Sequence, residues 1–192
     1  MSDAIRLFVA CELSGEVRAA LAHVQGELKG YGLQGLRWVR PEGIHLTLKF
    51  LGETPPDKVL AIQEALATAC QGIAPFVISL GEVGTFGNRR GPRVIWVDVA
   101  GEREALAHLQ ERVEGGLERL GFPREQRAFS PHLTLARVPP ELIASQGPRI
   151  REALAAVTVP EVRQAVAEVS LMRSILQRGG AAYERVAAWP LR

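Results

Sequence analysis

A twelve-residue pattern, Arg-x-x-Arg-x-x-x-x-His-Leu-Thr-Leu, occurs twice in this chain of 192 residues. The first copy ends at Leu48 and the second at Leu135, so the copies are 87 residues apart. Six identities in equal register indicate a duplicated unit, and a duplication predicts two halves of similar structure. The matching residues are Arg37 and Arg124, Arg40 and Arg127, His45 and His132, and the Leu-Thr-Leu segment after each histidine.

The alternation of side chains along a strand determines what each motif presents. In an extended chain, His45 and Thr47 lie on one face, and the two leucines of the motif lie on the other. The leucines can pack against helices, which leaves the polar face for a polar environment. If the halves pack about a pseudo-twofold axis, His132 and Thr134 of the second copy face the same central cleft.

Hydrophobic periodicity and turn residues divide the chain into strands and helices. We expect Ser14 to cap the first helix and Thr54, followed by two prolines and an acid, to cap the second. We expect a break in the fourth helix near Gly147 and Pro148, and a loop rich in glycine and arginine over 84–92. The expected strands are 5–13, 36–40, 44–51, 76–83, 93–99, 131–138, 162–176 and 182–189, the last two joined around Gly179 and Gly180; the expected helices are 14–30, 54–70, 103–120 and 140–156.

The order of these elements favours an α+β fold with antiparallel sheets. Strands often follow one another in pairs, and no glycine-rich phosphate loop follows the first strand, so a doubly wound parallel sheet is disfavoured. No low-complexity linker separates two domains. We therefore expect residues 1–192 to form a single domain whose lobes share one tight interface.

The composition is that of a globular protein, with 47% hydrophobic and 23% charged residues. The chain contains no run of 18 or more apolar residues, so we expect no transmembrane helix. The first residues lack the basic and apolar regions of a secretory signal. The two cysteines, Cys11 and Cys70, are expected to be reduced in a cytoplasmic protein.

The net charge of +2 is too small to indicate nucleic-acid binding by itself. The basic residues are nevertheless skewed, with 20 arginines against 3 lysines. Arginine suits two-pronged contacts with phosphate, and the compositional bias of a GC-rich genome explains the excess equally well.

The two motifs offer a cleft the groups that phosphoester cleavage requires. Two imidazoles with an ordinary pKa of ~6.5 can act as one general acid and one general base near neutral pH. The hydroxyls of Thr47 and Thr134 can donate and accept hydrogen bonds. Arg137, at the end of the second motif strand, is expected to share the face of His132 and to hold a phosphate.

Other assignments for these histidines are less consistent with the sequence. A single histidine on a strand is usually structural, but a duplicated pair argues against that explanation. No HExxH, HxH or nearby cysteine or acid gives metal-ligand spacing, so we expect no metal and no other cofactor. No G-x-S-x-G segment supports a serine nucleophile. His23 and His108 lie in expected helices and are interpreted as ordinary surface histidines.

At these residues the sequence resembles the two-histidine phosphoesterases, which are named for paired His-x-Ser/Thr-x motifs. Within that superfamily it is similar to the bacterial and archaeal RNA 2′,3′-cyclic phosphodiesterases, also called 2′-5′ RNA ligases. The resemblance covers nearly the whole chain. It is carried by Arg6–Ala10, Arg37–Val39, His45–Gly52, Pro92–Val97, Phe129–Arg137, Ser174–Leu176, Gly180 and Tyr183.

The resemblance implies a bilobal fold, with two antiparallel-sheet lobes and outer helices around a pseudo-twofold cleft. It implies hydrolysis of RNA 2′,3′-cyclic phosphate ends to 2′-phosphate ends without a metal. His45 would be the proton donor to the leaving 3′ oxygen, and His132 the base that activates water. Thr47 and Thr134 would bind the phosphate with help from Arg137. Neither motif departs from the family pattern.

Two other functions remain open at this point. One is a 2′-5′ RNA ligase that acts mainly on tRNA halves, and the other is a nucleotide-binding module without turnover. Phe8, Trp38 and the arginines of 89–93 are candidates to stack on or clamp the RNA end. Core packing is the alternative for the aromatic residues, and a solvated turn is the alternative for the arginines. We expect the protein to be a monomer and to bind RNA ends. We do not expect it to bind a membrane.

Overall fold

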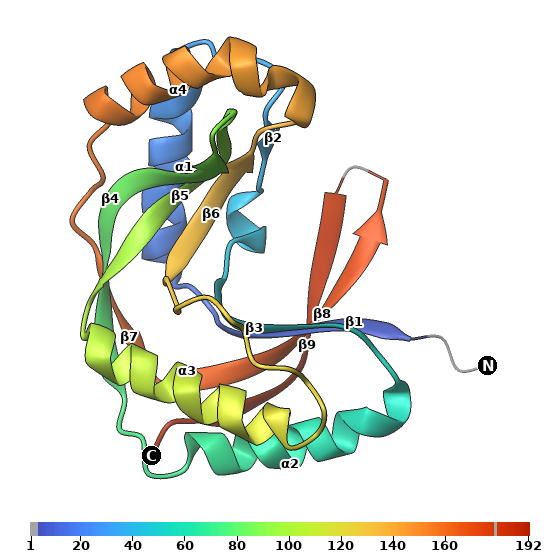
Figure 1. The fold of residues 1–192 in the computed structure, drawn as a ribbon. Coiled ribbons are helices and arrows are strands. Elements are labelled where there is room, and N and C mark those ends of the chain that lie inside the picture. Colours follow the sequence, from blue (N-terminus) through green and yellow to red (C-terminus); the bar gives the residue numbers. More distant parts are fainter. Residues whose placement is uncertain (1–3, 179) are drawn as a thin grey trace.

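The computed structural model describes residues 4–178 and 180–192 and contains two antiparallel sheets (Figure 1). A four-stranded sheet has the order β3-β1-β8-β9, and a five-stranded sheet has the order β2-β6-β5-β4-β7. The α+β prediction is therefore confirmed. The strands are β1 (Ile5–Cys11), β2 (Arg37–Trp38), β3 (Leu46–Thr54), β4 (Phe76–Asn88), β5 (Gly91–Gly101), β6 (His132–Arg137), β7 (Arg163–Val166), β8 (Glu168–Gln177) and β9 (Gly180–Pro190).

Four helices and three short 3-10 turns connect the strands. The helices are α1 (Gly15–Gly30), α2 (Val59–Cys70), α3 (Arg103–Glu118) and α4 (Ile143–Ala156). The 3-10 turns are η1 (Pro41–Gly43), η2 (Pro56–Lys58) and η3 (Pro140–Leu142). Across residues 4–178 and 180–192, none of the helices has both the length and the apolar character needed to cross a membrane.

The duplication is visible in the order of the strands. The segment β3-β1-β8 of the smaller sheet corresponds to β6-β5-β4 of the larger one, since each motif strand pairs with the first strand of its own half. The third strand of each set comes from the other half of the chain: β8 joins β1, and β4 joins β5. Neither sheet is therefore built from one half alone.

The helices cross between the halves in the same way (Figure 1). Helix α1 follows β1 but lies against the larger sheet, where Gln25 donates a hydrogen bond to the carbonyl of Leu135 in β6. Helix α3 follows β5 but packs against α2 and β3 of the smaller sheet. Each lobe is thus a sheet covered by helices from both halves.

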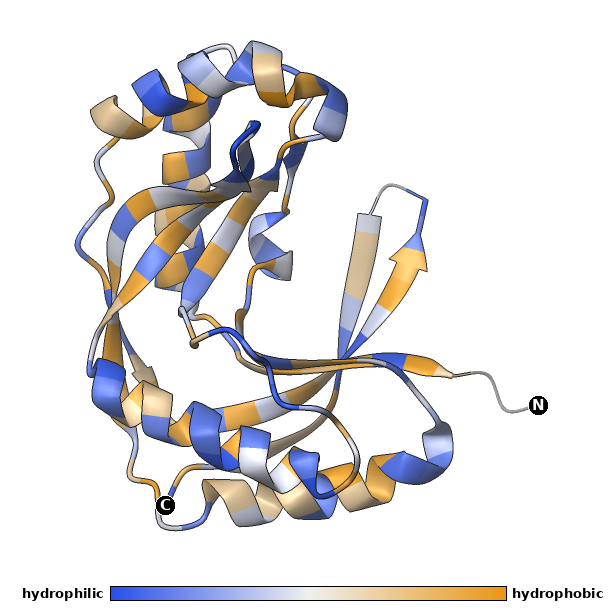
Figure 2. Ribbon diagram, in the orientation of Figure 1, coloured by the Kyte–Doolittle hydropathy of each residue, from blue (hydrophilic) through white to orange (hydrophobic). Residues whose placement is uncertain are grey.

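The buried residues of α1 and α3 recur at the same helical spacing, as expected of an amphipathic surface helix. Figure 2 shows hydrophobic and hydrophilic residues alternating along α3. The Ser14 hydroxyl caps α1 by accepting a hydrogen bond from the Val17 amide, as predicted. The buried residues are Val17, Ala20, Leu21, Val24, Gln25 and Leu28 in α1, and Leu106, Leu109, Gln110, Val113, Glu114 and Leu117 in α3.

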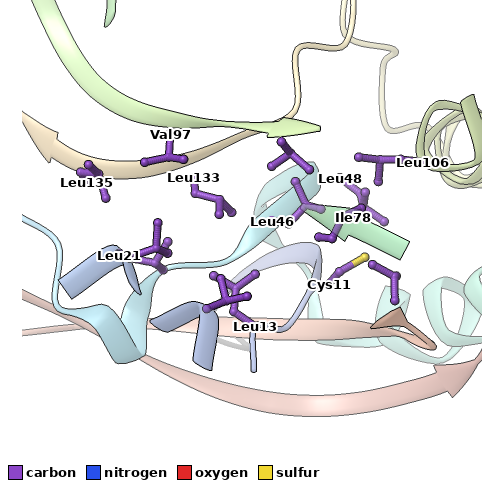
Figure 3. Packing of buried hydrophobic residues seen from close by; sticks show 14 of the residues in the cluster. Cys11, Leu13, Leu21, Leu46, Leu48, Ile78, Val97, Leu106, Leu133 and Leu135 are labelled. Carbon is purple, nitrogen blue, oxygen red and sulfur yellow. The ribbon is translucent and has the colours of Figure 1, made fainter. Parts of the chain in front are cut away.

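The motif leucines are part of one continuous core (Figure 3). Leu46 and Leu48 of β3 are buried, as are Leu133 and Leu135 of β6. Residues of the covering helices, among them Leu106, belong to the same cluster. Burying these leucines leaves the histidine and threonine of each motif on the opposite face, as the alternation predicts.

The predicted start of the second helix is wrong. Thr54 is fully buried at the end of β3, and its hydroxyl donates to the carbonyl of Gly52 instead of capping a helix. The two prolines begin the 3-10 turn η2, and α2 starts at Val59 without a side-chain cap. Burial of Thr54 in the sheet therefore outweighs its local capping propensity.

The predicted loop over 84–92 is also wrong, because β4 and β5 continue through it to a turn at Arg89 and Arg90. The prediction treated the glycines of this segment as turn residues, but Gly84 lies inside β4, where its lack of a side chain makes room for packing. A Cβ atom at Gly84 would lie 2.3 Å from the indole ring of Trp96. The absent side chain lets that ring lie across the neighbouring strand.

Two further boundaries differ from the prediction. Helix α4 runs without a break through Pro148, and Gly147 beside it packs near Pro92 of β5. The expected strand 162–176 is two strands, β7 and β8, separated at Ala167, whose carbonyl accepts a hydrogen bond from the Leu191 amide. The expected turn residue Gly179 lies outside the described residues.

Candidate active site

The two motifs line one cavity of about 1050 Å³ between the lobes. His45 and Thr47 reach it from the start of β3, and His132 and Thr134 reach it from β6. Arg137 lines the same cavity. The central cleft expected from the duplicated motifs is therefore present, and it brings together both histidines, both threonines and the arginine.

Both imidazoles are held by the same local hydrogen bond. Nδ1 of His45 lies 3.0 Å from the carbonyl oxygen of Gly43, and Nδ1 of His132 lies 2.7 Å from that of Ser130. A carbonyl oxygen can only accept, so in each ring Nδ1 carries the proton of this bond. In each ring Nε2 is then the nitrogen left for proton exchange with a substrate.

The two histidines differ in their surroundings. His45 is only 9% exposed and lies edge-on to Phe8 and Tyr183, with ring centroids 5.5 and 5.1 Å away. This burial lowers the pKa of His45, although the Gly43 hydrogen bond opposes the shift. His132 is less buried and lies edge-on to Phe86 at 4.8 Å.

We expect a titration of the free protein to show the effect of burial on His45. The pKa of the His45 imidazole should lie below the ordinary 6.5, because its charged form is desolvated. NMR of the ring protons during a pH titration measures it directly, and a His45→Ala variant assigns the signal. The pKa of His45 is lower in the folded chain than in the unfolded chain, so the unfolded chain takes up this proton first as the pH falls. The free energy of unfolding should therefore decrease below about pH 6.5. A pKa at or above 6.5 would contradict the burial argument.

Arg137 reaches the cavity because of a β-bulge. It lies three residues after Thr134, so uninterrupted alternation would turn it to the opposite face. In the pairing of β5 with β6, Trp96 lies opposite Thr134 but Ile95 lies opposite Ala136, which leaves Leu135 as the extra residue. The bulge restores Arg137 to the face of His132. The expected position is correct, but simple alternation does not explain it.

Strand β3 has a matching bulge, and it brings a residue to the cavity that the sequence analysis missed. Ala10 lies opposite Thr47 and Val9 opposite Lys49, so Leu48 is the extra residue. Phe50 is the equivalent of Arg137 after this bulge, and it lines the cavity with 70% of its surface exposed. The equal spacing after each motif was the signal that could have revealed it.

A buried glutamine donates to the carbonyl of the extra residue in each bulge. The side-chain amide of Gln25 in α1 donates to the carbonyl of Leu135 at 3.0 Å. That of Gln110 in α3 donates to the carbonyl of Leu48 at 3.5 Å. The Leu135 carbonyl also accepts a hydrogen bond from the Val39 amide at 2.9 Å, so in β6 the glutamine adds a second bond to the bulge that orients Arg137.

A buried ion pair anchors one wall of the cavity. Nζ of Lys49 lies 2.6 Å from Oε2 of Glu114, and both side chains are almost completely buried. The same Nζ donates to the carbonyl of Pro123 at 2.8 Å. Pro123 begins the cavity-lining segment that leads to Ser130 and His132. The pair therefore joins the first motif strand to the approach of the second.

The two aromatic candidates do not line the cavity. Phe8 is buried in a small cluster with Ala10 and Met172, and its ring lies 5.5 Å from that of His45 and 6.0 Å from that of Phe50. Trp38 is partly buried, packs against the core and lies under the Lys29 ammonium at 5.0 Å. Core packing, the alternative considered for both residues, describes these positions.

The upstream arginines of the repeat do not occupy equivalent places. Arg37 lies on the edge strand β2, opposite Arg137 of β6. Its counterpart Arg124 lies in the segment after α3, where it pairs with Glu111 at 2.6 Å and Glu118 at 2.7 Å. The sequence match before the histidines therefore extends further than the structural one.

The comparison with known protein families also divides the chain into two similar halves. One family model, described as LigT like phosphoesterase, matches residues 12–96 and again residues 97–183. The chain belongs to this family. The LigT-like model thus fits each half once, and together the two matches cover nearly the whole chain.

Two LigT-like relatives carry the name RNA 2′,3′-cyclic phosphodiesterase. The protein of Geobacillus stearothermophilus is 35% identical over 184 residues, which are 96% of this chain and 56% of that protein. The protein of Methanothermobacter thermautotrophicus is 35% identical over 186 residues, which are 93% of this chain and 95% of that protein. This chain thus spans a little over half of the first relative and nearly all of the second.

Solved structures show the same LigT-like fold. TT0787 of Thermus thermophilus superimposes with a TM-score of 0.76 at 32% identity, covering 97% of this chain and 98% of that chain. E. coli LigT complexed with 3′-AMP gives 0.72 at 29% identity and covers 99% of both chains. The two-lobed α+β architecture expected from the resemblance is therefore confirmed.

Proposed function

We propose that the chain hydrolyses RNA 2′,3′-cyclic phosphate ends to 2′-phosphate ends, with His45 as general acid and His132 as general base. The observation that carries this proposal is the cavity, where two imidazoles offer Nε2 toward the same space. The printed names of the Geobacillus and Methanothermobacter relatives support the substrate class. The 3′-AMP complex of E. coli LigT supports a nucleotide as the kind of ligand.

The unequal bulge residues support the assignment of acid and base. Arg137 is a cation on the strand of His132, and Phe50 is an exposed aromatic ring on the strand of His45. A guanidinium attracts the phosphate, and an aromatic ring can stack on the base. The ribose and its 3′ oxygen then lie toward His45, and the water that attacks phosphorus lies toward His132.

The reaction consists of one displacement at phosphorus. Nε2 of His132 accepts a proton from water as the water oxygen bonds to phosphorus. The bond from phosphorus to O3′ breaks, and the Nε2 proton of His45 passes to O3′. The product carries a 3′-hydroxyl and a 2′-phosphate, and proton exchange with solvent restores both imidazoles.

The remaining cavity groups stabilise charge. In this reaction Thr47 and Thr134 donate hydroxyl hydrogen bonds to the non-bridging phosphate oxygens, and Arg137 binds two of them. The phosphate also assists His45. The burial that lowers the pKa of His45 makes its protonated form a stronger acid, and the negative substrate favours protonation when it binds.

The proposal includes the form of the active unit. We propose that residues 1–192 act as one two-lobed domain and as a monomer. The support for a monomer is that both histidines, both threonines and Arg137 come from the same chain.

The deciding experiment is hydrolysis of an oligonucleotide that ends in a 2′,3′-cyclic phosphate. We expect a 2′-phosphate end, which NMR of the phosphorus or resistance to a 3′-specific phosphatase identifies. A 3′-phosphate product would reverse the direction of ring opening. No turnover at all would reject the proposed function.

We expect turnover to be independent of divalent metal ions. Among residues 4–178 and 180–192, no three His, Cys, Asp or Glu side chains are grouped so as to hold a metal ion. Prolonged treatment with excess chelator should therefore leave kcat/KM unchanged within about twofold, since the two imidazoles perform the proton transfers. Loss of activity that one divalent ion restores would show that a metal takes part.

A further inference from the structure

The arginines at the tip of the β4–β5 hairpin are not used by the proposed reaction. Within the turn, the side-chain oxygen of Asn88 accepts a hydrogen bond from the Arg90 amide at 2.9 Å. Arg89 and Arg90 are both exposed there. Figure 2 shows the tip as strongly hydrophilic. The turn therefore presents two exposed cations at the end of the hairpin.

Strand register places this tip beyond the phosphate-binding end of the cavity. Arg37, Arg137 and Val94 lie in one row across β2, β6 and β5, and Phe86 of β4 continues that row opposite Val94. Partners across a ladder share a face, so Arg37 is on the cavity face beside Arg137. From Phe86 the hairpin extends three more residues, or about 10 Å, to Arg89.

Arg37 and the two tip arginines form no ion pair in the part of the chain that the structure describes. Asp98 is opposite His132 at the other end of the same face, and Arg103 neutralises it at 2.9 Å. Toward the hairpin tip this face thus carries arginines without an ion-pair partner, whereas the acid at the His132 end is paired.

We infer that Arg37, Arg89 and Arg90, together called the arginine track, bind the phosphodiester backbone of single-stranded RNA on the 5′ side of the terminal nucleotide. The inference rests on the proposed function, because it places the cyclic end in the cavity. The arginine track then leads the preceding phosphates away from Arg137 along the five-stranded sheet. A backbone interaction of this kind is independent of base sequence and weakens as salt increases.

The test compares substrates of different length. Cyclic-phosphate substrates of one, two, four and eight nucleotides are hydrolysed by the unmodified chain and by the Arg37→Ser/Arg89→Ser/Arg90→Ser variant. We expect kcat/KM for the mononucleotide to agree within about twofold. For the octanucleotide we expect a loss of about tenfold or more, mainly in KM. The salt dependence of octanucleotide binding should also become shallower, by about 0.7 in logarithmic slope for each phosphate that the variant no longer neutralises.

The matched control removes arginines elsewhere. Arg163 pairs with Ser79 near the opposite end of β4, and Arg192 is the last residue; both are exposed. The Arg163→Ser/Arg192→Ser variant changes the net charge by two without touching the arginine track, and we expect it to retain octanucleotide activity. If the control lost as much octanucleotide activity per charge removed as the triple variant, the inference would be overturned. Equal loss by the triple variant on all substrate lengths would also overturn it.

A binding arm separates this inference from the proposed function. Fluorescence anisotropy with a labelled octanucleotide that ends in a 2′-phosphate measures affinity without turnover. If the chain binds this RNA and the triple variant does not, the arginine track is supported even if hydrolysis is never observed. If both bind equally, the arginine track is rejected even if hydrolysis occurs.

Discussion

Replacement of either cleft histidine by alanine is expected to lower kcat/KM for a cyclic-phosphate substrate by on the order of 10²-fold or more. Both imidazoles line the same cavity with Nδ1 held by a carbonyl, and in the proposed displacement each transfers a proton through Nε2. Groups that act together are not additive, so the His45→Ala/His132→Ala variant should lose little more than the worse single variant. Steady-state kinetics on one short substrate measures all three.

A substrate with a better leaving group distinguishes the two roles. A phosphodiester that releases 4-nitrophenolate needs little help from an acid. On that substrate His45→Ala should recover most of its activity, and His132→Ala should stay inactive. Recovery of His132→Ala instead would exchange the roles, and recovery of neither would remove the support for general acid catalysis.

The pH profile provides a second check on the pair. Because one ring must be protonated and the other neutral, kcat/KM should form a bell, and its limbs belong to the coupled pair. His23→Ala and His108→Ala are the matched controls, since both histidines are exposed on helices. A bell that persists in either active-site variant on the activated substrate would contradict the assignment.

The fold and the two cleft histidines could be predicted from the sequence because each left a periodic signal. A repeat of six residues at one spacing identified His45 and His132, and alternation placed the threonines beside them. Strand and helix order followed from hydrophobic periodicity. These features depend on neighbours a few residues apart, which is the range in which a sequence pattern is informative.

What could not be predicted depends on contacts between distant segments. The correct face for Arg137 requires a bulge, and a bulge is visible only in the pairing with β5. Gly84 resembles a loop residue in the sequence because its partner, the ring of Trp96, lies on another strand. Phe50 stands out in the sequence only as part of the family motif, because its exposure depends on the cavity that both lobes form.

Breaking the buried ion pair is expected to be the most damaging change outside the cavity centre. Lys49→Met leaves the Glu114 carboxylate buried, with the Gln110 amide at 3.2 Å as its remaining side-chain contact. Removing one partner of such a pair typically costs about 3–5 kcal/mol, because the other charge stays buried. Urea denaturation should show this loss as a lower transition midpoint.

The double variant shows that the cost comes from the unpaired charge. Lys49→Met/Glu114→Leu replaces both charges by apolar groups, and it should recover most of the stability that Lys49→Met loses. The surface pair of Arg173 and Glu184, 3.8 Å apart and well exposed, is the control, and Arg173→Ala should cost less than about 1 kcal/mol. A double variant as unstable as Lys49→Met would mean that the hydrogen bond to Pro123, not the charge pair, is the main contribution.

The matched bulges have a consequence for the direction in which a substrate can enter. Two identical half-length chains would carry the same residue after both bulges, and a ligand could then bind in two equivalent orientations related by half a turn. In this chain one bulge presents Arg137 and the other Phe50. In the proposed binding mode, turning the ligand around would place the phosphate on a benzene ring and the base on a cation. A single pair of unequal positions thus makes a nearly symmetric cavity recognise which end of its ligand is which.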